Sequence, residues 1–136
     1  MSGQISFIAP ARSRLANEFY AFAREDRLCI QKCSGCQAWH HIPRERCAHC
    51  GSFELAWAEC SGRGTLFSWT ETSTPPLPSL MEDVPFIVAL IELEEGPRVI
   101  CRLVDVDNDD LAVGQAFRAK MVSLTPEFSL TVFVPA

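Results

Sequence analysis

Four cysteines arranged as two closely spaced pairs constrain this chain more than any other feature. Cys33 and Cys36 form one C-x2-C pair, and after a gap of ten residues Cys47 and Cys50 form a second one. Two thiolates separated by two residues can turn toward one ion, and two such pairs complete a tetrahedral site with metal–sulfur distances of about 2.3 Å. The spacing therefore predicts a metal-binding ribbon.

The ion in such a site is expected to be structural, because four thiolates leave no coordination position for a water molecule or a substrate. Zinc is favoured, since the rest of the chain has the pattern of a binding domain. Iron stays open, as in a rubredoxin-like electron carrier, because the ligand set suits both metals. Gly35, inside the first pair, and Gly51, directly after the second, are expected to adopt positive φ in tight turns.

Nothing in the sequence indicates that the other cysteines and the histidines form a nucleophilic site. The remaining cysteines lie in apolar strand patterns and are expected to be small buried side chains: Cys29, Cys60 and Cys101. The three histidines are expected to be exposed in the ribbon: His40, His41 and His49. No local signature of a catalytic cysteine accompanies them. We therefore expect no catalytic residue.

An amphipathic helix is expected over Ser13 to Leu28, with Ser13 as its N-cap. Phe19, Tyr20 and Phe22 give this short helix a large apolar load. The helix can pack on its own domain, or these three rings can form a docking face for another subunit. Both interpretations remain open at this point.

The remainder of the chain has the pattern of β-structure. A short strand precedes the first cysteine pair at 28–32, and apolar residues alternate after the second pair at 53–57. Five further strands are expected at 63–71, 86–93, 98–104, 115–124 and 128–134. These strands lack helix-length gaps, so they favour a small antiparallel barrel of the OB type over a parallel sheet.

Charge and hydrophobic patterning exclude several classes of protein. The longest apolar run, Phe86 to Ile91, is far shorter than the roughly 20 residues of a membrane-spanning helix. The N-terminus lacks the order of a secretory signal, which favours the cytoplasm. The net charge of -5 argues against a general nucleic-acid binder. That class stays an alternative, since Trp39, Phe67 and Trp69 could stack on bases.

The basic side chains are concentrated in the first part of the chain. Residues 1–50 hold seven basic and four acidic side chains, whereas residues 51–136 hold five and thirteen. The groups expected near the junction of ribbon and barrel are Lys32, Arg44, Arg46 and Arg63, with Trp39 beside them. They are candidates for contact with the phosphates of coenzyme A or with a partner. The alternative is a role in solubility or in surface ion pairs with Glu45 and Glu59.

The order of these parts resembles the family called domain of unknown function 35, whose members combine a zinc ribbon with an OB-fold. The matching residues are Glu18 to Tyr20, Arg27 and Leu28, Cys33 to Gly51 with Pro43 and Arg44, Ser61 to Thr65 with Ser68, Pro85 to Leu90, Leu111 and Gly114, and Val132 to Ala136. Many members carry an aromatic-Pro-Pro-Arg run where this chain has His41-Ile42-Pro43-Arg44. The resemblance covers nearly the whole chain.

The resemblance implies a mainly β protein with an N-terminal helical segment (1–28), a rubredoxin-like four-Cys zinc ribbon (29–58) and a five-stranded OB-fold barrel (59–136). It also implies a non-catalytic accessory subunit. Such proteins bind a thiolase, a lipid-transfer-type thiolase or aldolase, an acyltransferase or an acyl-CoA hydratase, and some help to form the acyl-CoA site. Catalysis then belongs to the partner, and nucleic acid and membranes are not expected partners.

Overall fold

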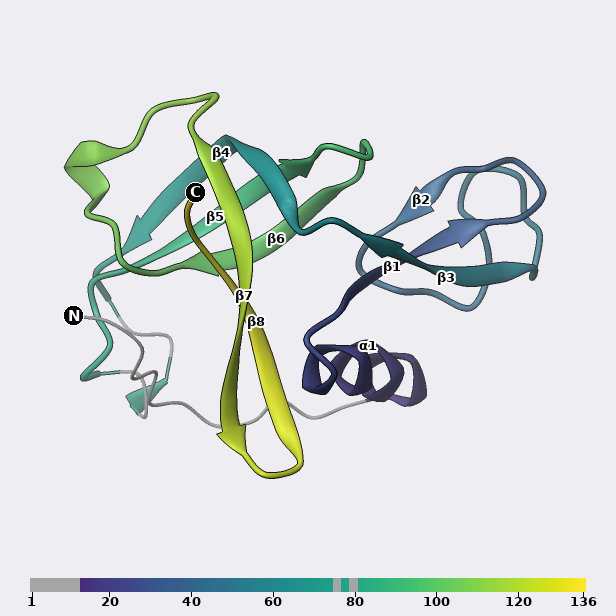
Figure 1. Cartoon of the computed structure of the whole chain (residues 1–136), viewed down its shortest axis with the longest axis horizontal. Helices are drawn as coiled ribbons and strands as arrows, with labels where there is room; N and C mark the ends of the chain where they lie inside the picture. The colour runs from purple at the N-terminus through teal and green to yellow at the C-terminus, as the bar shows by residue number, and fades with distance from the viewer. Residues whose placement is uncertain (1–12, 75–76, 79–80) are drawn as a thin grey trace.

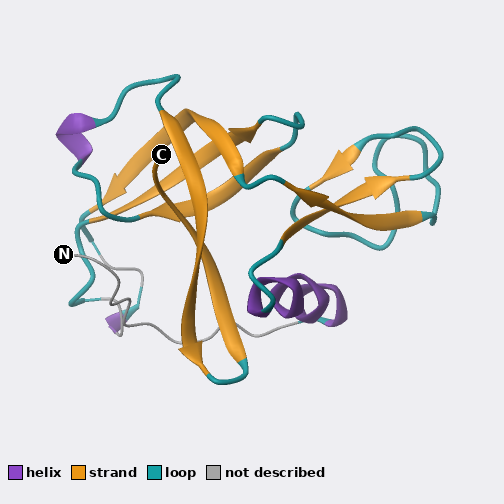
Figure 2. Ribbon diagram, viewed as in Figure 1, coloured by secondary structure: helices purple, strands orange, loops and turns teal. Residues whose placement is uncertain are grey.

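A computed structural model describes residues 13–74, 77–78 and 81–136 of the chain. It is mainly β, with one N-terminal helix, a small three-stranded sheet that carries the cysteine pairs, and a closed five-stranded barrel (Figures 1 and 2). The predicted fold class is confirmed. The first twelve residues of the expected N-terminal segment lie outside the described residues.

The helix α1 spans Arg14–Arg24 and begins as predicted at Ser13, whose side chain accepts a hydrogen bond from the Ala16 amide at 3.2 Å. The prediction that it continues to Leu28 is wrong. The amides of Glu25 and Asp26 close the last turn on carbonyls of the helix, and Asp26 then takes a left-handed conformation with φ of 61°. A short polar side chain tolerates that conformation better than a bulky one.

The ribbon sheet has the strand order β2-β1-β3. Its central strand β1 (Leu28–Cys33) pairs in antiparallel fashion with β2 (Trp39–His40) and along its whole length with β3 (Leu55–Cys60). The strand β3 begins two residues later than the alternation at 53–57 predicts. It also crosses the expected domain limit at residue 58, and the limits of the three segments stay a prediction.

The barrel consists of β4 (Arg63–Thr72), β5 (Phe86–Leu93), β6 (Arg98–Leu103), β7 (Ala116–Thr125) and β8 (Phe128–Pro135). The strands close in the order β4-β5-β6-β8-β7, and a short 3-10 helix, η2 (Asn108–Asp110), lies between β6 and β7. All neighbours are antiparallel except β6 and β8, which pair in parallel through two residues each. The predicted strands are confirmed to within one residue at each end.

One hydrophobic core fills the barrel and extends to the ribbon. Leu66, Ile91, Phe117 and Phe133 are fully buried inside the barrel, and Ile30 from the central ribbon strand joins the same cluster. In Figure 1 the hairpin of β7 and β8 projects beside α1, below the barrel. Among the described residues, no helix has the length and apolar character required to cross a bilayer.

Candidate metal centre and apolar pocket

The structure brings the four predicted ligand cysteines together. Their sulfur atoms all lie within 4.8 Å of one another, with Cys33 and Cys50 3.6 Å apart and Cys36 and Cys47 also 3.6 Å apart. Two sulfurs bound at about 2.3 Å to a tetrahedral ion lie about 3.8 Å apart. The four thiols therefore fit one tetrahedral metal ion, as the spacing of the two pairs predicts.

Backbone amides prepare two of these sulfurs to bind a metal as thiolates. Burial opposes ionisation of Cys47, but the amides of Cys50 and His49 and the His40 side chain lower the pKa of this thiol to about 5. The amide of Cys36 lowers the pKa of Cys33. Since a thiolate rather than a thiol ligates metal, these donors favour ion binding.

His40 lies beside the metal centre, contrary to the expectation that the ribbon histidines are exposed. Its side chain is buried, and its Nε2 atom lies 3.2 Å from the Cys47 sulfur. His41 is half-buried against the Phe19 ring, and only His49 is exposed. The sequence does not indicate the role of His40, because the cysteine spacing alone does not show which neighbouring side chain turns inward.

The two glycines of the ribbon behave differently. Gly51 has φ of +82°, as expected for the turn that follows the second cysteine pair. The expectation for Gly35 is wrong, and Gln37, one residue beyond the first pair, takes the left-handed conformation instead with φ of 68°. Both turns nevertheless close through the backbone, since the amides of Gln37 and Gly51 donate to carbonyls of the two cysteine pairs.

The three remaining cysteines are not equivalent. Cys29 and Cys60 are buried among apolar residues as expected. Cys101 is only partly buried and lines a pocket, described below. Burial raises the pKa of Cys60 and of Cys101 to about 12, so both thiols are protonated at neutral pH.

Several of the predicted basic contact residues already have partners within the chain. The Lys32 ammonium lies over the Trp39 ring at 4.8 Å. Arg46 donates to the Gly51 carbonyl at 2.8 Å, and Arg63, at the start of β4, pairs with Glu94 at 3.0 Å. These side chains are thus engaged within the chain, and their contact with coenzyme A or a partner stays a prediction.

Arg44 differs from the other predicted cations. Its amide donates to the buried Gln31 side chain at 2.8 Å, which fixes the ribbon loop, while its own side chain is exposed. The preceding residues of that loop, His41 to Pro43, reach the edge of the pocket. Arg44 is therefore the predicted contact residue that lies beside this pocket along the chain.

The three aromatic residues of α1 pack within the chain and are half-buried. Phe19 contacts His41 and Trp57, Tyr20 stacks on Phe128 with ring centroids 4.6 Å apart, and Phe22 meets Trp57 edge-on. These contacts fasten the helix to the ribbon and to β8. The docking role of the three rings stays a prediction.

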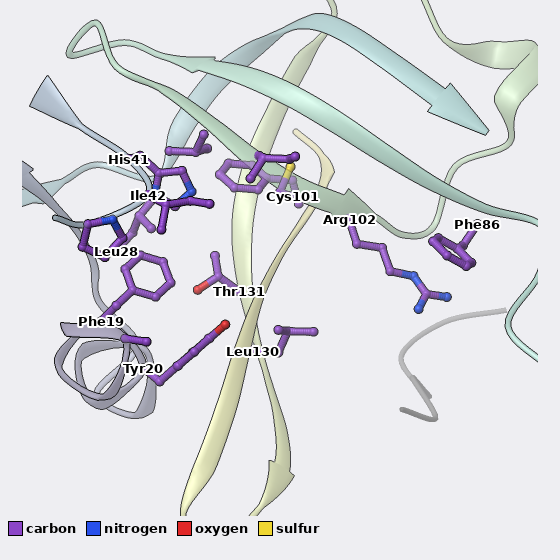
Figure 3. Close-up of a pocket in the computed structure, with 15 residues that line it drawn as sticks. Phe19, Tyr20, Leu28, His41, Ile42, Phe86, Cys101, Arg102, Leu130 and Thr131 are labelled. Carbon is purple, nitrogen blue, oxygen red and sulfur yellow. The ribbon is translucent and has the colours of Figure 1, made fainter. Parts of the chain in front are cut away.

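An apolar pocket of about 400 Å³ lies where α1, the ribbon loop and the barrel meet. Phe19 and Tyr20 line it from the helix, Ile42 from the ribbon loop and Leu130 from β8 (Figure 3). The volume falls within the range of small-molecule sites, roughly 300–1,000 Å³. The sequence does not indicate this pocket, because its walls come from segments far apart in the chain.

Among the described residues that line the pocket, Arg102 alone is charged. It pairs with Asp83 at 3.3 Å and lies over the Phe86 ring at 4.9 Å. Its side chain is 20% exposed and that of Asp83 is 7% exposed. The Nε atom of Arg102 is buried without a hydrogen-bond partner among the described residues. The sequence offers only a weak signal, since Arg102 is the second of two arginines in the strand β6.

Two family models match consecutive parts of the chain. Residues 21–56 match the model described as "ChsH2, rubredoxin-like zinc ribbon domain", and residues 57–122 match "ChsH2, C-terminal OB-fold domain". Together the two models span the helix end, the ribbon and most of the barrel. They agree with the fold and the metal centre described above.

Curated relatives carry names from acyl-CoA metabolism or from scaffolding. A "Probable enoyl-CoA hydratase alpha subunit" of Thermomonospora curvata is 35% identical over 93% of this chain, which spans only 39% of that relative. A "DUF35 domain-containing scaffold protein" of Methanothermobacter thermautotrophicus is 30% identical over 57% of this chain and 74% of its own length.

A solved structure described as "Ltp2-ChsH2(DUF35) aldolase" contains a chain of the same fold. The two chains superimpose with a TM-score of 0.81 and 35% sequence identity, covering 93% of this chain and 98% of the other. The similarity extends through the helix, the four-cysteine ribbon and the barrel. The chain therefore belongs to the DUF35 family of zinc-ribbon and OB-fold proteins.

Proposed function

We propose that this chain is a non-catalytic subunit that binds a thiolase-like enzyme and helps to form its acyl-CoA site. The observation that carries the proposal is the match, over 98% of its length, to the DUF35 chain of an aldolase. That chain corresponds to this one in extent as well as in fold. If this chain also assembles with a thiolase-like aldolase or acyltransferase, its similarity to that chain in both length and fold is explained.

The described residues support an accessory role. Burial raises the pKa of all three cysteines outside the metal centre, which opposes their use as nucleophiles at neutral pH. The four remaining cysteines are fully committed if they hold an ion. Acyl-CoA chemistry in such an assembly would then depend on side chains of the partner. This arrangement is consistent with the cytoplasm, where thiols stay reduced.

The proposal includes zinc as the structural ion. The ribbon supplies four sulfur ligands, and the His40 ring lies within hydrogen-bonding distance of one of them, Cys47. A four-sulfur site suits zinc as well as iron. A purified preparation should be colourless and contain one zinc ion per chain by elemental analysis. Visible absorption together with stoichiometric iron would contradict this assignment and favour electron transfer.

The central experiment is affinity purification of the tagged full-length chain from its native cells, with identification of the proteins that accompany it. A thiolase-like enzyme should be recovered in stoichiometric amount. The partner, purified alone, should turn over its acyl-CoA substrate more slowly than the reconstituted assembly, whereas this chain alone should be inactive. Recovery of a stable monomer without an enzyme would contradict the proposal.

A pair of surface variants sharpens this test. Ile42 is 69% exposed and lies at the pocket, so a shared acyl-CoA site places it near the partner. Ile42→Asp should weaken recovery of the enzyme at least tenfold. Val113 is 71% exposed and does not line the pocket, so Val113→Asp serves as the matched control and should leave recovery unchanged.

A further inference from the structure

The hairpin formed by β7 and β8 extends beyond the closed part of the barrel (Figure 1). The strand β4 pairs with β7 only at residues 116–118, and its contact with β7 ends where the Ala119 amide donates to the Gly62 carbonyl at 2.8 Å. The pairing of β7 with β8 continues beyond that point to Thr125. The second half of β7 therefore has a neighbouring strand on one side only.

The backbone hydrogen bonds of β7 show which groups lie at this open edge. The Ala116 carbonyl accepts from the Ala136 amide on the β8 side, whereas the Ala119 amide is directed toward β4. Because successive residues of a paired strand direct their amide and carbonyl groups to alternate sides, those of Met121 and Ser123 point away from β8. The register of β7 on β8 is regular up to Ser123. Outside the ladder with β8, no hydrogen bond to these backbone groups occurs among the described residues.

An open edge of this kind is a template for another strand, since its donors and acceptors already have the spacing of a β-ladder. Proteins usually protect such edges with proline, with charged side chains or with a covering element. The β8 side of this hairpin lies against α1, whose Tyr20 ring stacks on Phe128. Residues 119–125 of β7 contain no proline and a single charged residue, Lys120. The edge of β7 is thus available for pairing.

The free groups of β7 are complementary to those of a second copy of the same strand. With a two-fold axis through Val122, antiparallel pairing places Met121 opposite Ser123 of the second copy, and Ser123 opposite its Met121. Each of these two pairs exchanges two hydrogen bonds, so every free amide and carbonyl of Met121 and Ser123 finds a partner. The turn at residues 126–127 then directs each chain toward its own β8, away from Gly62, which already occupies the place opposite Ala119.

The charges near the two ends of this edge match in the same arrangement. Arg118 and Lys120 precede the paired segment, and Glu127 lies in the turn beyond it. Antiparallel pairing brings the two cations of one copy to the end that holds Glu127 of the other. Within the described part of the chain these three side chains form no ion pair, and Arg24 contacts only the backbone carbonyl of Glu127. Charge complementarity therefore favours a second copy as the occupant of the edge.

We propose that the open edge of β7 is the interface of a two-fold dimer of this chain, in which the two hairpins join as one four-stranded sheet in the order β8-β7-β7-β8. No residue of β7 lines the apolar pocket, so the dimer leaves that pocket accessible in both copies. The paired segment is short, which places the interface in the weak class. The inference does not depend on the proposed function.

The test uses the full, metal-loaded chain without an enzyme. Sedimentation velocity between about 10 and about 1,000 μM should show a monomer that converts to a dimer as the concentration rises. Amide hydrogen exchange, measured by NMR at the two ends of this range, locates the contact. The amides of Met121 and Ser123 should exchange more slowly in the dimer. The amide of Val113, a residue that is 71% exposed outside the strands, should exchange equally at both concentrations.

A matched pair of variants tests the backbone hydrogen bonds. Ser123→Pro removes an amide that faces outward and leaves the ladder with β8 in place, a position where sheets tolerate proline. It should raise the dissociation constant of the dimer at least about tenfold, because two of the four proposed bonds are lost. Ser123→Ala keeps the amide and should leave the dissociation constant unchanged. Thermal unfolding verifies that both variants are folded.

A charge reversal tests the same interface without altering the backbone. Arg118→Glu and Glu127→Arg should each weaken the dimer severalfold at low ionic strength, where surface charges are least screened. The double variant restores opposite charges across the interface and should dimerise as the wild type does. This measurement decides the question if Ser123→Pro does not fold.

A monomer at every concentration, or a dimer that Ser123→Pro and the single charge reversals leave as tight as the wild type, would overturn the proposal. A monomer whose Met121 and Ser123 amides become protected only when an enzyme is added would overturn it as well. That result would show that a strand of the enzyme occupies the edge. Dimerisation is measured without an enzyme, so its failure leaves the accessory role standing.

Discussion

The Cys47 sulfur accepts hydrogen bonds from the backbone amides of His49 and Cys50 at 3.3 and 3.4 Å, and the His40 ring lies 3.2 Å away. A thiolate that binds an ion keeps negative charge that such donors stabilise. The buried His40 is the one side chain among these donors. Substitution of His40 can therefore alter the surroundings of Cys47 without changing a metal ligand.

We predict that His40→Ala lowers metal affinity by about 10- to 100-fold, the usual effect of losing a hydrogen-bond partner of a metal ligand. Competition with a chromophoric chelator measures the change. His49→Ala is the matched control, because its side chain is exposed and only its backbone amide contacts Cys47. Equal affinity of the two variants would show that the His40 ring does not contribute.

Gly64 lies in β4 beside β5, where no room remains for a side chain. A Cβ atom at this position would lie 2.5 Å from the Glu92 carbonyl oxygen and 2.7 Å from a methyl carbon of Ile91. The backbone of β5 cannot move away without loss of its pairing. Gly64, the second glycine of the Ser-Gly-Arg-Gly-Thr segment, is thus required because the two strands lie so close together.

Accordingly, Gly64→Ala should lower the free energy of unfolding by about 1–3 kcal/mol, the usual cost of overpacking. Denaturant unfolding with metal in excess measures it. Gly35→Ala is the comparison, since its Cβ would meet the Cys33 sulfur at an ordinary 3.6 Å. A Gly64→Ala protein as stable as the wild type would show that β4 and β5 separate easily.

At the residue scale, the sequence predicts the metal ligands better than the residues that pack around the metal centre and the pocket. The four ligand cysteines follow from spacing, because a tetrahedral ion demands a fixed number of thiolates. The inward turn of His40 and the switch of positive φ from Gly35 to Gln37 depend on how the ribbon loops pack. Arg102 and Asp83 meet only after β6 and the loop before β5 are placed.

At the scale of helices and strands, the sequence again predicts the features that nearby residues determine better than those that distant residues determine. Ser13 caps α1 as expected, because capping involves only nearby residues. The helix ends before Leu28, since Leu28 is used in pairing with Cys60 in the ribbon sheet. The apolar run that begins at Phe86 likewise predicts the bounds of β5, whereas the parallel pairing of β6 with β8 could not be predicted from either strand.

Removal of the metal should disorder the ribbon loops before the barrel. The three-stranded sheet has little core of its own at the cysteine end, whereas the barrel is closed and filled by residues such as Phe117. Hydrogen exchange after chelation should show early loss of protection between Cys33 and Leu55, with β5 still protected. Simultaneous loss in both regions would show that the metal supports the entire chain.

Across the whole molecule, acidic groups dominate the barrel surface. Trp69 donates to the Asn108 side chain at 2.9 Å, within a region that also holds Asp107, Asp109 and Glu71. Phe67 is covered by the Arg98 guanidinium at 3.8 Å, and Arg98 pairs with Glu92. The Phe67 ring is therefore already covered by a cation of the chain, and the acidic groups around Trp69 repel phosphate groups.

The chain should therefore not bind single-stranded DNA at low ionic strength. Fluorescence anisotropy of a labelled oligothymidine should stay unchanged up to about 100 μM protein, the weak end of non-specific binding. A single-strand-binding OB-fold protein serves as the positive control. Saturable, salt-sensitive binding would revive the nucleic-acid alternative.

The position of β8 in the barrel sets an order of events during synthesis on the ribosome. All four ligand cysteines lie within residues 33–50, and β3, which completes the ribbon sheet, ends at Cys60. The barrel closes only when β8, residues 128–135, enters between β6 and β7. The nascent chain can therefore capture its ion while the barrel is still an open meander, and the apolar pocket arises in the final step of folding.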